Sequence, residues 1–192
     1  MNERILVAAR TSLAVFSLLS SLGCTTTGGR SADPETRRQS IDAAVDQALS
    51  RLQKEVPASR DMISSAKGVL VFPSILTGGF VVGGAHGQGA LRKGGTTDGY
   101  FSMTAVSVGL LIGAQTKSLF ILFMTQEALD RFEASSGWTA GVDGSVALLN
   151  MGASAAVDTR TAQRPIVGYV LTNGGLMANL SLDGTRIARL DL

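Results

Sequence analysis

The glycine-rich stretch at residues 74–91 reads SILTGGFVVGGAHGQGAL and contains the only histidine of the chain. Glycine-rich loops can cradle phosphate groups, but a dinucleotide site needs Gly-x-Gly-x-x-Gly leading into a helix. Here Gly84, Gly87 and Gly89 have the reverse spacing and lie between residues typical of β-strands, and no Gly-Lys-Ser/Thr follows them as a P-loop requires. The stretch therefore predicts a sheet in which glycine permits bulges, strong twist or close backbone approach.

Residues that often carry catalysis are scarce in this chain. One histidine, His86, and one cysteine, Cys24, cannot form a zinc cluster, and the Gly-x-Ser-x-Gly elbow of serine hydrolases is absent. A serine and an aspartate could still meet His86 in space, which keeps a hydrolase as an alternative. Because a lone histidine in a glycine-rich strand is more often structural, we expect a non-catalytic protein without a metal or cofactor.

Basic residues cluster near the ends of predicted strands. Arg60 and Lys67 flank the first predicted strand, Arg92 and Lys93 follow the glycine-rich stretch, and Lys117 is placed in a turn at QTKS. If the fold brings these five cations together, they form a predicted basic rim that could bind anionic lipid head groups, at about 1 kcal/mol per charge. The alternative is that they are scattered, solvated charges.

The overall charge points to no nucleic-acid partner. The chain carries a formal net charge of +2. Removal of residues 1–23 takes away Arg4, Arg10 and Glu3 and leaves a net charge of +1. Such a balance lacks the basic excess that binding to nucleic-acid phosphates requires.

Residues 1–23 have the features of a signal peptide. Arg4 and Arg10 precede an apolar stretch at 11–22, which is too short to span a bilayer. Cys24 follows directly and, as the only cysteine, cannot form an internal disulfide. Its context, SLGC, resembles the lipobox of bacterial lipoproteins, in which the cysteine is acylated with fatty acids such as palmitate and becomes the N-terminus.

Two consequences follow from the lipobox resemblance. The residue after the cysteine is Thr25 and not an aspartate, and by this resemblance the protein is expected to be an outer-membrane lipoprotein that faces the periplasm or the surface. Residues 24–33 are small and polar, as a flexible tether should be. The alternative to acylation is an ordinary secretory signal followed by an incidental cysteine.

Residues 34–192 are predicted to form one domain that begins with a helix. Asp33 and Pro34 have the residue types of an N-cap and first helical position, and Pro57 ends the run. Between them, apolar residues recur at spacings of three and four, which predicts an amphipathic helix of about 22 residues. Its polar face mixes both signs of charge, which favours packing on the domain over lying on a membrane surface.

The rest of the domain is predicted to be mostly strands. The segment 100–124 is apolar, but its polar residues, with Lys117 in the interior, argue against a membrane span. It is predicted to form two buried strands that meet at QTKS. Thr125 is the predicted cap of a further helix near 125–135, and turns are expected at 173–174 and 183–184. The predicted fold class is α+β, with the N-terminal helix packed on a glycine-rich, largely antiparallel sheet or barrel-like sandwich.

Several motifs occur in order along the chain: AKGVLVFPSILTGGFVVGGAHGQGAL, DGYFS, IGAQTKSLFILFMTQEALDRF and GLMANLSLDG. Together they resemble the SYLF domain family over residues 35–190. Eukaryotic members of that family bind phosphoinositides and membranes, and some bind actin, whereas bacterial members are mostly secreted or lipid-anchored. The family is not known for catalysis.

The resemblance and the residues together predict a lipid-anchored envelope protein that binds anionic lipid head groups. Phosphoinositides are scarce in bacterial envelopes, so the expected ligand is an anionic phospholipid or glycolipid, and a phosphoinositide-like lipid is the alternative. The alternative function is a structural or partner-binding envelope module. In that case the apolar strand SLFILFM could pair two copies into a homodimer, provided that it lies at a sheet edge.

Overall fold

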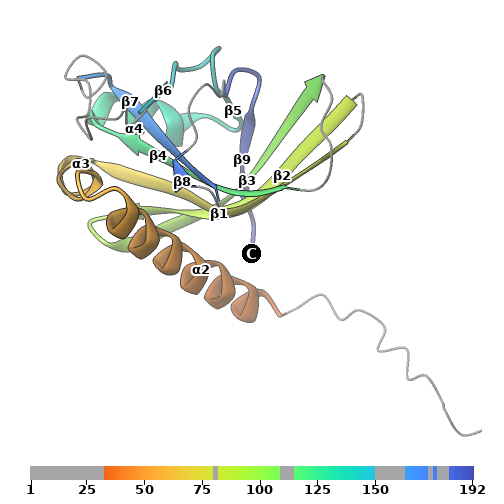
Figure 1. Ribbon diagram of the computed structural model, residues 1–192, viewed down its shortest axis with the longest axis horizontal. Coiled ribbons are helices and arrows are strands. Elements are labelled where there is room, and N and C mark those ends of the chain that lie inside the picture. The colour runs from red at the N-terminus through yellow and green to blue at the C-terminus, as the bar shows by residue number, and fades with distance from the viewer. Residues whose placement is uncertain (1–32, 80–81, 109–114, 150–162, 173–174, 177–181) are drawn as a thin grey trace, which may run out of the picture. The chain divides into compact units, whose positions relative to one another are not determined.

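The computed structural model describes residues 33–79, 82–108, 115–149, 163–172, 175–176 and 182–192 (Figure 1). The predicted signal peptide, Cys24 and nearly all of the predicted tether lie outside the described residues.

Three helices lie in the described part of the chain, and they are α2 (Pro34–Glu55), α3 (Ser59–Ser65) and α4 (Gln126–Ala134). The apolar stripe of α2 is buried as its periodicity predicted, with Val45 and Leu52 fully covered. The predicted cap of α4 is confirmed, because the backbone N–H of Ala128 donates to the hydroxyl of Thr125 at 3.3 Å. No helix among the described residues is long and apolar enough to cross a membrane.

A single mixed sheet forms the rest of the described fold. Its strands are β1 (Gly68–Gly79), β2 (Val82–Lys93), β3 (Thr96–Val108), β4 (Gln115–Phe123), β5 (Trp138–Thr139), β6 (Ala147–Leu148), β7 (Ile166–Thr172), β8 (Gly175–Leu176) and β9 (Arg186–Leu190).

The strand order is β5-β9-β3-β2-β1-β4-β7-β6, with β8 paired to β7 off this path. All described strand pairs are antiparallel except β6 with β7. The α+β class, the leading helix and the largely antiparallel sheet are therefore confirmed. The sheet is one curled layer, so the sandwich form of the prediction does not apply.

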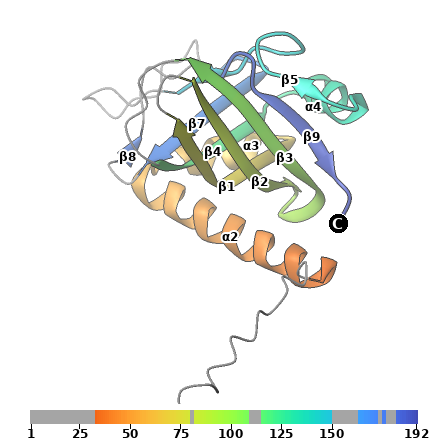
Figure 2. The same ribbon diagram turned by 90° about the vertical axis from the view of Figure 1, so that its right-hand side faces the viewer.

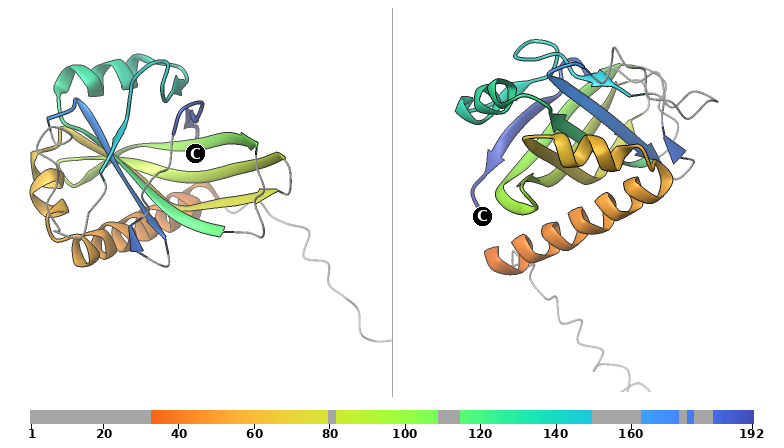
Figure 3. Two further views of the ribbon diagram at one scale, coloured as in Figure 1. Left: turned by 45° about the horizontal axis from the view of Figure 1, so that its top comes forward. Right: turned by 90° about the vertical axis from the view of Figure 1, so that its left-hand side faces the viewer.

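The curled sheet separates two hydrophobic cores. Helices α2 and α3 cover its outer face, while α4 lies over its inner face (Figures 2 and 3). Alternate residues of β1 serve the two sides: Val69 and Val71 pack toward α2, and Leu70 and Phe72 pack into the inner core. This two-sided burial explains why the central strands read as continuous apolar runs.

The glycine-rich stretch forms the paired strands β1 and β2, as predicted. Gly89 permits the closest approach, because a Cβ there would lie 2.8 Å from the carbonyl carbon of Val71 and nearer still to its oxygen. The pairing of β1 with β2 shifts register between Val71 and Ser74. Pro73 lies in this interval, and it has no backbone N–H to donate to the neighbouring strand. Glycine therefore serves sheet geometry here.

Two expectations about the segment 100–124 are wrong. Lys117 lies inside β4 and not in a turn, because the strand already pairs with β1 from Gln115 onward. Strands β3 and β4 do not pair with each other: β3 lies between β2 and β9, and β4 lies between β1 and β7. Since both edges of β4 are occupied, SLFILFM is not a sheet edge that could join two copies.

Candidate functional site: a cationic sheet end and an apolar pocket

Arg92 of the predicted basic rim is bound to α2. Its Nη2 lies 2.7 Å from Asp46 Oδ1 and 3.5 Å from Asp42 Oδ1, and its side chain is only 12% exposed. Asp42 also accepts hydrogen bonds from the hydroxyls of Thr97 at 2.7 Å and Tyr100 at 2.8 Å. Burial, together with the hydrogen bond to Asp42, raises the pKa of Tyr100 to about 12. These contacts hold α2 against the β2–β3 hairpin.

Lys93 is likewise occupied by carboxylates. Its Nζ lies 2.5 Å from Glu133 Oε1 of α4 and 3.2 Å from Asp98 Oδ1 of β3. The hydrogen bond to Glu133 is the main cause that raises the pKa of Lys93, against an opposing effect of desolvation. Neither Lys93 nor Arg92 therefore presents an unpaired charge to an anionic ligand.

The other three predicted rim residues lie at two different ends of the sheet. Arg60 on α3 and Lys67 just before β1 are exposed at the end where β1 begins. Lys117 pairs in register with Ile75, which is about 20 Å further along β1 at roughly 3.3 Å per residue. Arg92 pairs in register with Val69, so Arg92 and Lys93 also lie at the end where β1 begins. Of the five predicted cations, only Lys117 is separated from the others along the sheet.

Arg164, which the sequence analysis did not single out, lies at the same end as Lys67. The register aligns Gly68 with Phe123 and Phe123 with Ile166, so the start of β1, the end of β4 and the start of β7 lie side by side. The backbone N–H of Lys67 donates a hydrogen bond to Phe123 O at 2.8 Å. Directly after β4, the backbone N–H of Met124 donates to Pro165 O, also at 2.8 Å. Arg164 immediately precedes Pro165.

We use the term sheet-end cations for Arg60, Lys67 and Arg164. All three are exposed, and none forms an ion pair with another described residue. The signal in the sequence was the pattern of a cation before a proline and a buried strand, RPIVGYVL. The pattern alone does not place Arg164 near Lys67, because this requires the pairing of β7 with β4.

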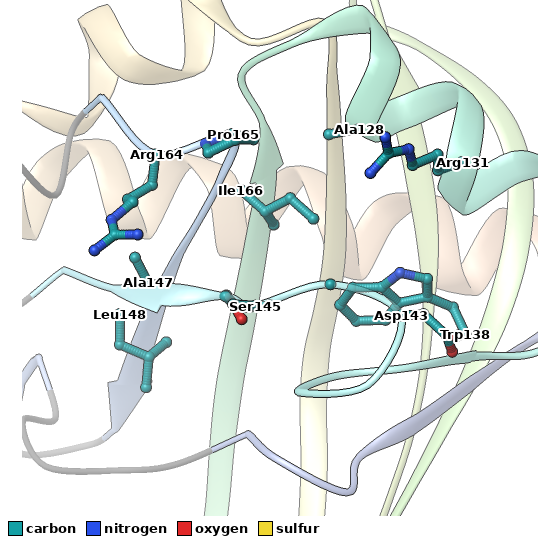
Figure 4. Close-up of a pocket in the computed structure, with 12 residues that line it drawn as sticks. Ala128, Arg131, Trp138, Asp143, Ser145, Ala147, Leu148, Arg164, Pro165 and Ile166 are labelled. Carbon is teal, nitrogen blue, oxygen red and sulfur yellow. The ribbon is translucent and has the colours of Figure 1, made fainter.

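A pocket of about 580 Å³ opens beside Arg164 on the inner side of the sheet (Figure 4). Its described lining comes from α4, β5, the segment through β6, and the start of β7. The lining residues are Ala128, Arg131, Trp138, Asp143, Gly144, Ser145, Val146, Ala147, Leu148, Arg164, Pro165 and Ile166.

The pocket joins an apolar interior to two guanidinium groups. Trp138 and Ile166 belong to the buried inner core, and Val146 and Leu148 pack against that core. Arg131 and Arg164 approach from opposite sides, with Ile166 between them (Figure 4). Guanidinium groups suit phosphate and carboxylate ligands, and the apolar walls suit a hydrocarbon.

His86 has no catalytic partners of the serine-hydrolase type around it in the described part of the chain. His86 is exposed on β2, in an open hollow of about 410 Å³ that it shares with Ser40 and Ser74, and no carboxylate is among the described residues that line it. No group of three potential metal ligands occurs in the described part of the chain. The main pocket above contains neither histidine nor cysteine among its described lining.

Residues 104–191 match the family described as Ysc84: Las17-binding protein actin regulator, which is the SYLF family. Residues 104–191 belong to the SYLF family. The SYLF match begins within β3 and runs through β9, so it includes every described residue that lines the pocket. Helix α2 and the glycine-rich stretch precede the matched residues. None of the curated proteins matches this chain.

Proposed function

We propose that this SYLF protein is a non-catalytic lipoprotein of the bacterial envelope that binds anionic lipid head groups. In this proposal the chain is anchored through acylated Cys24, and the domain faces the periplasm or the surface. The family's description covers binding to Las17 and regulation of actin, so a binding role rather than catalysis agrees with it. His86 is exposed, and no carboxylate lies among the described residues that line its hollow, which also favours a role without turnover.

The observation that carries the proposal is the set of sheet-end cations. Arg60, Lys67 and Arg164 gather at one end of the sheet and have no carboxylate partner among the described residues. At an anionic bilayer each such cation contributes about 1 kcal/mol, and the attraction falls with ionic strength. Arg92 and Lys93 leave the proposed site, since α2 and α4 already neutralise them.

Co-sedimentation with vesicles tests this proposal. The protein from residue 24 onward, with Cys24→Ser to remove the acyl anchor, is mixed with vesicles of phosphatidylglycerol or of phosphatidylcholine at low and high salt. We expect salt-sensitive binding to phosphatidylglycerol only. Lys67→Glu changes the local charge by two and should weaken that binding by about tenfold or more.

The matched control is Lys117→Glu, the same charge reversal at the far end of β1. It should leave vesicle binding within about twofold of the parent protein, because a charge roughly 20 Å away is beyond the screening length of physiological salt. Equal loss in both variants would show that only net charge matters and would reject the sheet-end cations. Absence of binding to any vesicle would reject the lipid proposal itself.

A homodimer without specific lipid recognition is the second candidate, and it requires an edge other than β4. Strand β3 pairs with β9 only from Tyr100 to Thr104, so residues 105–108 have no strand on that side in the described part of the sheet. Val106 is 81% exposed there. Unpaired strand edges that carry an apolar side chain favour pairing between copies.

Light scattering on the Cys24→Ser protein distinguishes the two candidates. The dimer requires twice the monomer mass at high protein concentration, and Val106→Lys should return that mass to the monomer. A monomer at every concentration removes the dimer and leaves the lipid proposal standing.

A further inference from the structure

We propose that the pocket between α4, β6 and β7 binds a single-chain anionic amphiphile, such as an alkyl phosphate or a lysophospholipid, as a monomer. This goes beyond binding to a membrane surface, because the ligand would be taken out of the bilayer or out of solution. The charge, the walls and the size of the pocket each favour such a ligand.

The charge at the pocket mouth favours an anion. Arg164 has no ion-pair partner among the described residues, and the pair of Arg131 with Glu127 at 2.5 Å is largely exposed, at 71% and 75%. Exposed ion pairs contribute little to stability, so Arg131 can turn to a ligand at small cost. Asp143 is the one carboxylate of the described lining, and it already accepts a hydrogen bond from the Thr139 N–H at 2.7 Å.

The walls favour a hydrocarbon chain beneath that anion. Trp138 is 2% exposed, and its indole belongs to the inner core together with Ile166. Val146 and Leu148 are half-buried and pack against that core, so they supply the apolar surface that a ligand can reach. A free inorganic anion would use the arginines and leave the accessible apolar surface of Val146 and Leu148 in contact with water, which is unfavourable.

The size restricts the ligand to one chain. A volume of about 580 Å³ equals roughly twenty water molecules at about 30 Å³ each and lies within the range of small-molecule pockets. A head group and one alkyl chain fill such a space, whereas a phospholipid with two long chains exceeds it. The pocket is therefore matched to single-chain species.

Trp138 is the only tryptophan in the chain, and it lines the pocket, so its fluorescence reports occupancy directly. The Cys24→Ser protein is titrated with decyl phosphate below its micelle concentration. We expect a saturable change in tryptophan emission. The double variant Arg131→Gln with Arg164→Gln should raise the apparent Kd about tenfold or more, because two charge-assisted contacts are lost.

Three controls make the result decisive. Lys67→Gln removes a sheet-end cation that does not line the pocket, and it should leave the titration unchanged even if it weakens vesicle binding. Decyl maltoside, which is uncharged, and inorganic phosphate, which has no chain, should each bind at least about tenfold more weakly. Both arginines are on the surface, so we expect the double variant to fold, and thermal melting tests this expectation.

The outcomes separate this inference from the vesicle proposal. Saturable binding of decyl phosphate that depends on the two arginines supports the pocket, whether or not the protein binds vesicles. Equal binding of decyl maltoside, equal binding of inorganic phosphate, or an unchanged Kd in the double variant would overturn it. A titration with no saturable change in emission would overturn it as well.

Discussion

Replacement of Gly89 by alanine is expected to destabilise the fold by at least about 3 kcal/mol, and the variant should be largely unfolded if the parent is marginally stable. A Cβ at this position would lie 2.8 Å from the carbonyl carbon of Val71 and 3.0 Å from the Cα of Phe72. Both are backbone atoms of the neighbouring strand, so no side-chain rotation can relieve the overlap. Strands β1 and β2 would have to separate, at the centre of the sheet.

Urea unfolding followed by circular dichroism measures this loss. The matched control is Gly78→Ala on the paired strand β1, where a Cβ would meet no atom within 4 Å. That variant should be as stable as the parent or slightly more so, because alanine lowers the entropy of the unfolded chain. If Gly89→Ala unfolds at the same urea concentration as Gly78→Ala, β1 and β2 do not approach each other as closely at Gly89 as described, and the prediction fails.

Truncation of Phe132 is the second large effect we expect. Phe132 projects from α4 into the inner core, where its ring centroid lies 5.1 Å from that of Phe101, 4.8 Å from that of Phe123 and 5.9 Å from that of Trp138. Phe132→Ala should cost about 3–5 kcal/mol through lost burial and an unfilled cavity. Because these rings join α4, β3, β4 and β5, the loss should appear as lower stability of the whole domain.

Phe132→Leu keeps most of the apolar volume and should cost only about 1–2 kcal/mol. Tryptophan emission is a second measurement, since the ring of Phe132 shields Trp138. Phe132→Ala should shift the emission to longer wavelength under native conditions, and Phe132→Leu should shift it less. A variant Phe132→Ala with parental stability would show that α4 does not pack as described.

The two stability predictions also support the functional tests. The inner core that Phe132 organises holds Trp138 and Ile166, which form part of the pocket. Loss of amphiphile binding in Phe132→Ala would therefore accompany unfolding and would carry no information on the pocket. The surface variants of Arg131, Arg164 and Lys67 are the informative ones, since their side chains lie outside the core clusters.

The elements predicted correctly from sequence are those whose signals are local. The period of the apolar residues in 34–56 placed helix α2, since spacings of three and four put those residues on one face. Thr125 marked the start of α4 because a cap bonds to an N–H three residues away. The glycine-rich stretch was correctly predicted as sheet because its glycines are flanked by β-type residues and lack the spacing of a phosphate loop.

The predicted basic rim was only partly assembled because sequence cannot show which charges meet. Arg92 lies 50 and 46 residues from Asp42 and Asp46 along the chain, yet it pairs with both. Arg92 is not free to bind an anionic ligand, because α2 packs across β2 and brings these two carboxylates to it. The pairing of β4 with β1 likewise places Lys117 opposite Ile75, eight residues after Lys67 in the chain.

The sequence by itself determined the α+β class, the leading helix, the family and the absence of a phosphate-loop motif, since each depends on residue types and short spacings. Only the tertiary structure decided the order of the strands and the residues of the candidate site. Arg131 and Arg164 come from different elements, and they line one pocket because β7 pairs with β4 and α4 packs over the inner face. Pairing between distant strands depends on the packing of the whole sheet, which no local pattern encodes.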